Sequence, residues 1–145
     1  KIGDYEGQAW RIKKIAELHH EAENYEEALE YNQRGIKVSE ALDDLELKAE
    51  FMNNIGKVYY YLKQHDEALK YYHQALEIAD KIENLSLKAD FCNNIAGVHF
   101  MNLNYKEALD MAHRSLQNLR LIGRGNSLKG TILRKRIEKI EKLVE

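Results

Sequence analysis

The strongest constraint on the fold of this chain is a pattern of residues that recurs every 40 positions. The tripeptide Glu-Ala-Leu occurs at residues 27–29, 67–69 and 107–109. Segment 45–84 aligns with segment 85–124 without a gap, and fifteen of the 40 aligned residues are identical. A fixed period of this length is typical of proteins built from stacked structural repeats, in which each unit covers the hydrophobic face of its neighbour.

Within each repeat the apolar residues follow the spacing of α-helices. In the middle repeat, Met52, Ile55 and Tyr59 are separated by three or four residues, as on one face of a helix. A second series of this kind follows a short break, and strict alternation, which is typical of strands, is missing. The chain lacks proline and has few glycines, which favours long helices with tight connections. We therefore predict an all-α chain with two antiparallel helices in each unit, the units covering residues 5–44, 45–84 and 85–124.

The connections between helices are predicted from polar residues at the breaks in the apolar pattern. We expect Asn24, Asn84 and Asn104 at helix ends, because asparagine tolerates left-handed backbone and caps exposed backbone groups. Asp66 suits the start of a helix, where its carboxylate meets the positive end of the helix dipole. The breaks are expected near residues 23–24, 43–44, 63–64, 83–84, 102–104 and 123–126.

Small residues occupy three columns of the aligned repeats, which predicts close contacts between helices. A large residue in such a column would overpack the contact and cost roughly 1–3 kcal/mol. The three columns are Ala16, Gly56 and Ala96; Ala28, Ala68 and Ala108; and Gly35, Ala75 and Ser115.

This combination of columns resembles the tetratricopeptide repeat over about residues 5–124. The period of 40 exceeds the usual ~34 residues, and the proline that usually follows the second helix is missing. The resemblance implies a right-handed α-solenoid of three helical hairpins. Long-period repeats of this kind are similar to those of kinesin light chains, spindle-orientation adaptors, and bacterial peptide-sensing regulators and sensor kinases. In the middle unit the resemblance is carried by Met52, Ile55, Gly56, Tyr59, Ala68, Leu69, Tyr72 and Ala75.

Residues 126–145 depart from the repeat pattern that is expected over residues 1–125. The favoured interpretation is a C-terminal capping helix that covers the open end of the stack. Its apolar stripe would be Leu128, Ile132, Ile137, Ile140 and Val144. The alternative is the start of a coiled coil, because Leu133, Ile137, Ile140 and Val144 have the spacing of a heptad seam.

Composition excludes several functional classes. Charged residues make up 32% of the chain but the net charge is only -2, whereas nucleic-acid binding needs a concentrated basic face. No apolar run is long enough to span a membrane. Catalytic, metal-binding and phosphate-binding motifs are missing, so we expect no enzymatic activity, no metal and no cofactor. The single cysteine, Cys92, fits a reducing compartment and is expected to be a small core residue.

The resemblance implies that the first helices of the hairpins line a concave groove that binds a protein or peptide. Amides in this groove would bond the backbone of an extended peptide, and aromatic residues would supply contact area. Asn54 and Asn94 have a second interpretation, because a buried amide often bonds a neighbouring helix instead. The predicted groove residues are Lys13, Glu17, His20, Asn53, Asn54, Lys57, Tyr60, Tyr61, Asn93, Asn94, Phe100 and Met101, with Glu21 beside them.

One binding mechanism of the family is not expected here. Chaperone-adaptor repeats hold a terminal carboxylate with lysines and asparagines. Lys13 and Asn54 match two of these positions. Glu17 stands where an asparagine is expected and would repel a carboxylate, and Asn53 and Asn93 stand where lysines are expected.

We therefore expect a peptide-binding scaffold without nucleic-acid or membrane partners. The resemblance places it in the cytoplasm, as the recognition or sensor part of a larger bacterial signalling or regulatory protein. The alternative is a self-association module, in which the groove or residues 126–145 bind a second copy and so dimerise an attached output domain.

Overall fold

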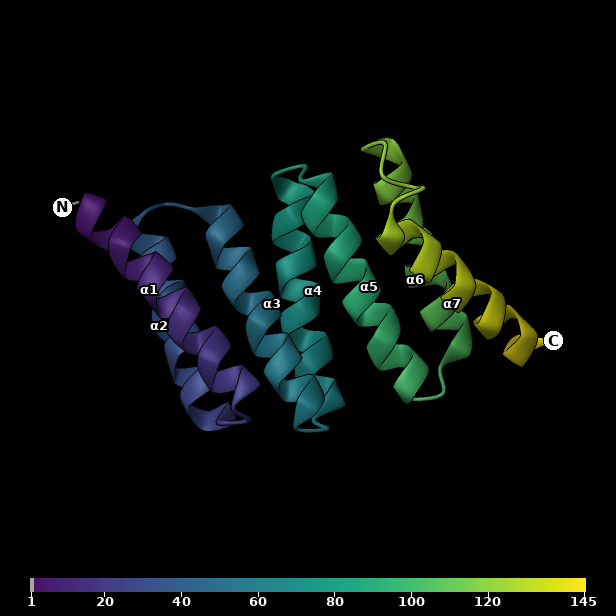
Figure 1. The fold of residues 1–145 in the computed structure, drawn as a ribbon, viewed down its shortest axis with the longest axis horizontal. Helices are drawn as coiled ribbons and strands as arrows, with labels where there is room; N and C mark the ends of the chain where they lie inside the picture. The colour runs from purple at the N-terminus through teal and green to yellow at the C-terminus, as the bar shows by residue number, and fades with distance from the viewer. Residues whose placement is uncertain (1) are drawn as a thin grey trace. The chain divides into compact units, whose positions relative to one another are not determined.

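The computed structural model describes residues 2–145, in which the chain forms helices and no strand. Lys1, the first residue of the predicted repeat region, lies outside the described residues. The predicted all-α helical-repeat architecture is confirmed (Figure 1). The helices are α1 (Ile2–Glu21), α2 (Tyr25–Ala41), α3 (Leu45–Tyr61), α4 (His65–Lys81), α5 (Leu85–Met101), α6 (Tyr105–Leu121) and α7 (Leu128–Val144).

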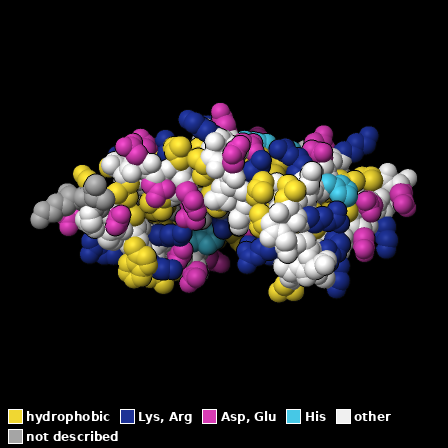
Figure 2. Space-filling model, turned by 90° about the horizontal axis from the view of Figure 1, so that it is seen from above, with side chains coloured by type: hydrophobic (Ala, Val, Ile, Leu, Met, Phe, Trp, Pro, Cys, Tyr) yellow, Lys and Arg dark blue, Asp and Glu magenta, His cyan; other side chains and the backbone are white. Residues whose placement is uncertain are grey.

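These helices form two compact units, of which the first ends at Ile78 and the second begins at Ala79. In the first unit α1 and α2 lie side by side, and α3 packs against α2 (Figure 1). In the second unit α5 packs against α6, and α6 packs against α7. On the face in view in Figure 2, basic and acidic side chains are interspersed. No helix among the described residues is both long and apolar enough to cross a membrane.

The 40-residue period arises from a uniform helix and loop length. Helices α2 to α6 each have 17 residues, and three-residue loops join α1 to α6 in succession. The middle residue of every such loop has a positive φ between 52° and 63°. This conformation lets the next amide bond a carbonyl of the last helical turn, as Asn24 N does with His19 O at 2.8 Å. Left-handed residues commonly end helices in this way. The five left-handed residues are Glu23, Asp43, Lys63, Glu83 and Leu103.

The predicted asparagines lie at helix starts and are not left-handed. Asn24, Asn84 and Asn104 have φ near −85° and precede the first turn of the next helix. Asn84 caps that helix by accepting a hydrogen bond from Leu87 N at 3.1 Å, whereas Asn24 and Asn104 make no side-chain cap bond. The prediction that these asparagines lie at helix ends is confirmed, but none of the three has the left-handed conformation. The left-handed site is one residue earlier, where a charged residue or a leucine stands.

The small-residue columns mark close contacts between helices. Ala28, Ala68 and Ala108 are fully buried. An added Cβ on Gly35 would overlap the ring of Phe51, and one on Gly56 would lie 2.6 Å from Cδ1 of Tyr72. The prediction that these columns exclude larger residues is confirmed at both glycines.

Cys92 lies in the core, as expected, whereas Tyr59 is only half-buried. The thiol of Cys92 is fully buried, and burial raises its pKa to about 11. Tyr59, predicted as a core residue, is half-buried and stacks on Tyr71 with the ring centroids 5.6 Å apart. His19, one repeat earlier, stacks in the same way on Tyr31 at 5.4 Å.

Helix α7 packs through only part of the predicted stripe, because Ile137 and Ile140 are buried but Val144 is 41% exposed. Leu133, Ile137 and Ile140 are buried, and α7 contacts α6. Leu128 and Ile132 are 78% and 50% exposed, so their assignment to the packing stripe was wrong. The reason is the rotation of the helix about its axis. Leu133, Ile137 and Ile140 are spaced by four and three residues and lie on one helical face, whereas Leu128 and Ile132 lie beside that face.

Candidate functional site

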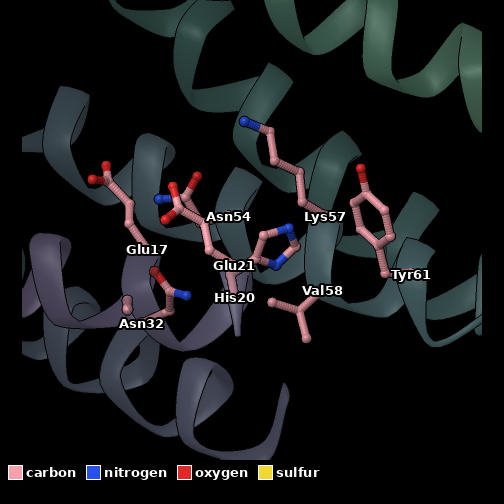
Figure 3. Close-up of a pocket in the computed structure, with 9 residues that line it drawn as sticks. Glu17, His20, Glu21, Asn32, Asn54, Lys57, Val58 and Tyr61 are labelled. Atoms are coloured by element: carbon pink, nitrogen blue, oxygen red, sulfur yellow. The ribbon is translucent and has the colours of Figure 1, made fainter. Parts of the chain in front are cut away.

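The first unit contains a hollow of about 360 Å³ between α1, α2 and α3 (Figure 3). Helix α1 and helix α3 are the first helices of their hairpins and form the walls. Helix α2 contributes one residue, Asn32. The lining residues are Ala16, Glu17, His20, Glu21, Asn32, Asn54, Lys57, Val58 and Tyr61.

One residue of the lining has a short side chain at a position where the next repeat has a long one. Asn32 aligns with Tyr72 one repeat later. In the second hairpin the ring of Tyr72 is 2% exposed and packs against Gly56. In the first hairpin the corresponding pair is Asn32 and Ala16, and both line the hollow. An amide occupies much less volume than a phenol ring, and the remaining space stays open.

The amide of Asn32 is held in one orientation. Its Nδ2 donates a hydrogen bond of 2.8 Å to the carbonyl oxygen of Ala28. A carbonyl can only accept, so the amide oxygen must lie on the other side of the group. That oxygen, Oδ1, is buried and has no hydrogen-bond partner among the described residues. Leaving a buried acceptor unpaired costs roughly 1–3 kcal/mol. A hydrogen-bond donor that reaches this oxygen would remove that cost.

Charged residues of both signs surround the hollow. Glu17 and Glu21 come from α1, and Lys57 comes from α3. Glu17 also pairs with the exposed Lys14 at 3.0 Å. Beside the hollow, Lys13 Nζ and Glu50 Oε2 form an ion pair at 2.7 Å that joins α1 to α3.

An aromatic cluster adjoins the hollow. The ring of His20 meets Tyr61 edge-on at 5.0 Å and Tyr25 at 5.8 Å, and Tyr25 stacks on Tyr61 at 6.4 Å. Burial lowers the pKa of His20, and the nearby Lys57 lowers it further, whereas Glu21 opposes the shift. The lowered pKa favours the neutral form of His20, and the cluster presents aromatic surface to the hollow.

Five of the twelve predicted groove residues line this hollow: Glu17, His20, Asn54, Lys57 and Tyr61.

Three other predicted residues of the first unit lie elsewhere. Tyr60 lies beside the hollow and contacts Tyr61 and His65. Lys13 is engaged by Glu50. Asn53 is 6% exposed and does not line the hollow, although its neighbour Asn54 does.

In the second unit, α7 contacts the predicted binding face of α5. Asn93 Oδ1 accepts a hydrogen bond of 2.6 Å from Arg136, and Asp90 pairs with Lys129 at 2.8 Å. A hollow of about 150 Å³ lies here, lined in part by Asn93.

The remaining predicted residues lie elsewhere on α5. Phe100 has its ring 5.7 Å from that of Tyr105, and Lys139 lies over its face at 5.9 Å. Asn94 is half-buried and Met101 is 53% exposed.

Sequence reasoning missed Asn32 because it considered only the first helices of the hairpins. The signal was present in the aligned repeats, where an amide replaces the aromatic residue of the next unit. Val58 was also missed. It is 1% exposed, and its place at the hollow depends on how α3 packs.

The arrangement suits non-covalent recognition. It offers hydrogen-bonding amides, two carboxylates, an ammonium group and aromatic surface. Within residues 2–145, no group of three or more His, Cys, Asp or Glu side chains is placed to hold a metal ion.

One comparison with known proteins identifies a family. The family model described as "Tetratricopeptide repeat" matches residues 3–82. A comparison with curated proteins found no match.

Solved structures similar to this chain include three with TM-scores between 0.67 and 0.70. The N-terminal domain of stress-induced protein-1 (STI-1) from C. elegans has a TM-score of 0.70 and 18% identity, covering 92% of this chain and 94% of that one. The Sgt2 TPR domain from Aspergillus fumigatus has a TM-score of 0.69 and 14% identity, covering 94% and 78%. BtubC (BKLC) from P. vanneervenii has a TM-score of 0.67 and 17% identity, covering 94% and 64%. At these identities the likeness shows the fold alone.

Proposed function

Because this chain belongs to the tetratricopeptide repeat family, whose fold is a protein-interaction scaffold, we propose that it is a non-catalytic module that binds a peptide segment of a protein partner. The observation that carries the proposal is the hollow between α1 and α3, which has a polar and aromatic lining and a buried acceptor without a partner. Ligand sites are typically concave, with a few polar groups that fix orientation.

Each lining group has a role in this proposal. The amide of Asn54 bonds the backbone of the bound segment, because an amide can both donate and accept. Tyr61 is 57% exposed and supplies contact area together with His20, as aromatic residues do at interaction hot spots. A side chain of the segment enters the hollow and anchors it. The predicted contribution of Asn53, which is buried, is replaced in this proposal by that of Asn54.

We also propose a wider context for the module. The similarity of its 40-residue period to that of bacterial peptide-sensing regulators supports a place inside the cell, as the sensor part of a larger signalling protein. Helices α5 and α6 form the third repeat in this proposal, and α7 caps it. The support is that α5 begins 40 residues after α3 and that α7 buries its apolar face within the second unit.

A selection from a random peptide library tests the peptide-binding function. The bait is the wild-type chain, and the counter-bait is the double variant Ala16→Gly, Asn32→Tyr, which copies the Gly56–Tyr72 pair into the first hairpin. We expect enriched peptides that bind the wild type and lose most of their affinity for the double variant, because the ring fills the hollow. Circular dichroism controls for folding of the variant. Failure to enrich any peptide, or equal binding to both baits, contradicts the proposal.

A second candidate function is self-association through α7. Leu128 and Ile132 are one helical turn apart and are largely exposed, and exposed apolar patches often mark interaction sites. Light scattering at two concentrations tests this, using the wild type and the variant Leu128→Ser, Ile132→Ser. A dimer in the wild type that the variant loses favours self-association. A concentration-independent monomer argues against it.

A further inference from the structure

We propose that the hollow beside Asn32 receives an arginine side chain of the partner segment. The inference rests on the proposed peptide-binding function and specifies the chemistry of the residue that enters the hollow. Three features of the first unit carry it: an unpaired buried acceptor, a pair of carboxylates and an aromatic wall.

The unpaired acceptor requires a donor. Asn32 is 2% exposed, and its Oδ1 has no partner within the described part of the chain. The bond from Nδ2 to Ala28 O fixes the amide, so the group cannot rotate to offer its own donor instead. A ligand that brings an N–H to this oxygen removes the cost of an unpaired acceptor. A purely apolar side chain in the hollow would leave that cost in place.

The carboxylates favour a donor that carries positive charge. Glu17 and Glu21 line the hollow with Asn32. The bond between Glu17 and Lys14 is an exposed pair, which stabilises little and is readily exchanged for a bond to a ligand. Among the described residues that line the hollow, Lys57 alone is a lysine or arginine. In Figure 3 its ammonium lies at the top of the view, whereas Asn32 lies at the bottom.

The aromatic wall distinguishes arginine from lysine. Tyr61 and His20 line the same hollow with their ring centroids 5.0 Å apart, and His20 lies close enough to Glu21 for the carboxylate to affect its pKa. A guanidinium group stacks on such rings, and it is planar and weakly hydrated. It also has several N–H groups, so it can donate to Asn32 and to a carboxylate together. An ammonium group is more strongly hydrated and loses more on entering the hollow.

Three short probes test this chemistry: acetyl-Gly-Arg-Gly-amide and the same peptide with citrulline or norleucine in place of arginine. Citrulline keeps part of the donor set but has a carbonyl oxygen in place of one terminal NH2 group and carries no charge. Norleucine lacks both the donors and the charge. The readout is the concentration-dependent shift of the Asn32 side-chain amide signal in ¹⁵N–¹H spectra. We expect the arginine probe to bind about tenfold more tightly than the citrulline probe, the usual gain of a charge-assisted bond, and norleucine to bind most weakly. Equal binding of arginine and norleucine overturns the proposal.

Single substitutions test the roles of the lining residues in opposite directions. Because Asn32→Leu removes the side-chain amide signal, binding to the variants is followed by the backbone amide signals of the residues that line the hollow. Asn32→Leu and Glu21→Gln should each weaken the binding of the arginine probe several-fold, whereas Lys57→Gln should strengthen it. Gln33→Leu, an exposed site on the same helix, is the matched control and should change nothing. If Asn32→Leu loses its helical circular dichroism, the inference is tested by the substitutions at the exposed Glu21 and the half-buried Lys57. Unchanged affinity in both of those variants contradicts the inference.

The two proposals fail separately. If the peptide library yields binders without arginine whose affinity survives arginine-to-citrulline replacement, the module binds peptides but the inference is wrong. If the arginine probe binds at Asn32 but no library peptide is enriched, the hollow takes a guanidinium group, but the proposed function fails and with it the assignment of that group to a partner segment.

Discussion

At the scale of single residues, glycine is required at two positions of the small columns because a neighbouring helix packs closely there, and not because the backbone conformation demands it. Gly35 and Gly56 are both helical, and an added Cβ on either would overlap an aromatic ring. Gly97, also helical, has open space where its Cβ would be. Close packing therefore requires glycine at position 35 but leaves room for a side chain at position 97.

We expect Gly35→Ala to lower the free energy of unfolding by roughly 1–3 kcal/mol, because the added methyl overpacks the contact with Phe51. The matched control, Gly97→Ala, should raise it by about 0.5–1 kcal/mol, since alanine favours the helix over glycine. Urea denaturation followed by circular dichroism measures both. A stabilising Gly35→Ala would mean that Phe51 moves aside without cost.

The buried amide of Asn32 shows the same dependence on neighbours. Nothing about asparagine in a helix predicts an unpaired oxygen. It arises because the carbonyl oxygen of Ala28 binds the nitrogen and because no donor among the described residues reaches the oxygen.

At the scale of elements, the loops between α1 and α6 share one geometry, but the helix starts are capped unequally. Asp44 accepts a hydrogen bond from Leu47 N at 2.9 Å at the start of α3. Asn24, at the start of α2, makes no side-chain cap bond.

We expect Asp44→Ala to lower the free energy of unfolding by about 1 kcal/mol, the usual value of a cap bond. Asn24→Ala should cost less, because it removes no such bond. Thermal unfolding of the two variants at one pH and salt concentration tests this. Equal losses would show that side-chain capping does not distinguish the two helix starts.

At the scale of the whole molecule, the chain consists of two compact units whose features differ. The first holds the larger hollow, with its lining open to a ligand. In the second, α7 donates to Asn93 through Arg136 and buries Leu133, Ile137 and Ile140. Its packing therefore contributes to the stability of the unit.

We expect Ile137→Ala to destabilise the second unit by about 2–5 kcal/mol, since it leaves a cavity in a packed core. Ile132→Ala, at a half-exposed position on the same helix, should change stability by less than about 0.5 kcal/mol. Chemical denaturation measures both. Similar effects at the two sites would indicate that α7 does not pack through the Leu133–Ile137–Ile140 face.

The sequence by itself determined the features that repeat. Helix type, loop positions and the small columns recur every 40 residues, and each depends on local backbone geometry or on contacts that every unit makes. Because each of these features occurs in several units, it can be recognised even where one unit departs from the pattern.

Tertiary structure alone decided the features that differ between units. Successive helical residues point about 100° apart, so only the packing of α3 shows that Asn54 faces the hollow while Asn53 is buried. The packing face of α7 was set in the same way by its rotation against α6. The hollow itself is space left over when side chains from three helices meet, and the volume of that space depends on all of them together rather than on any one segment.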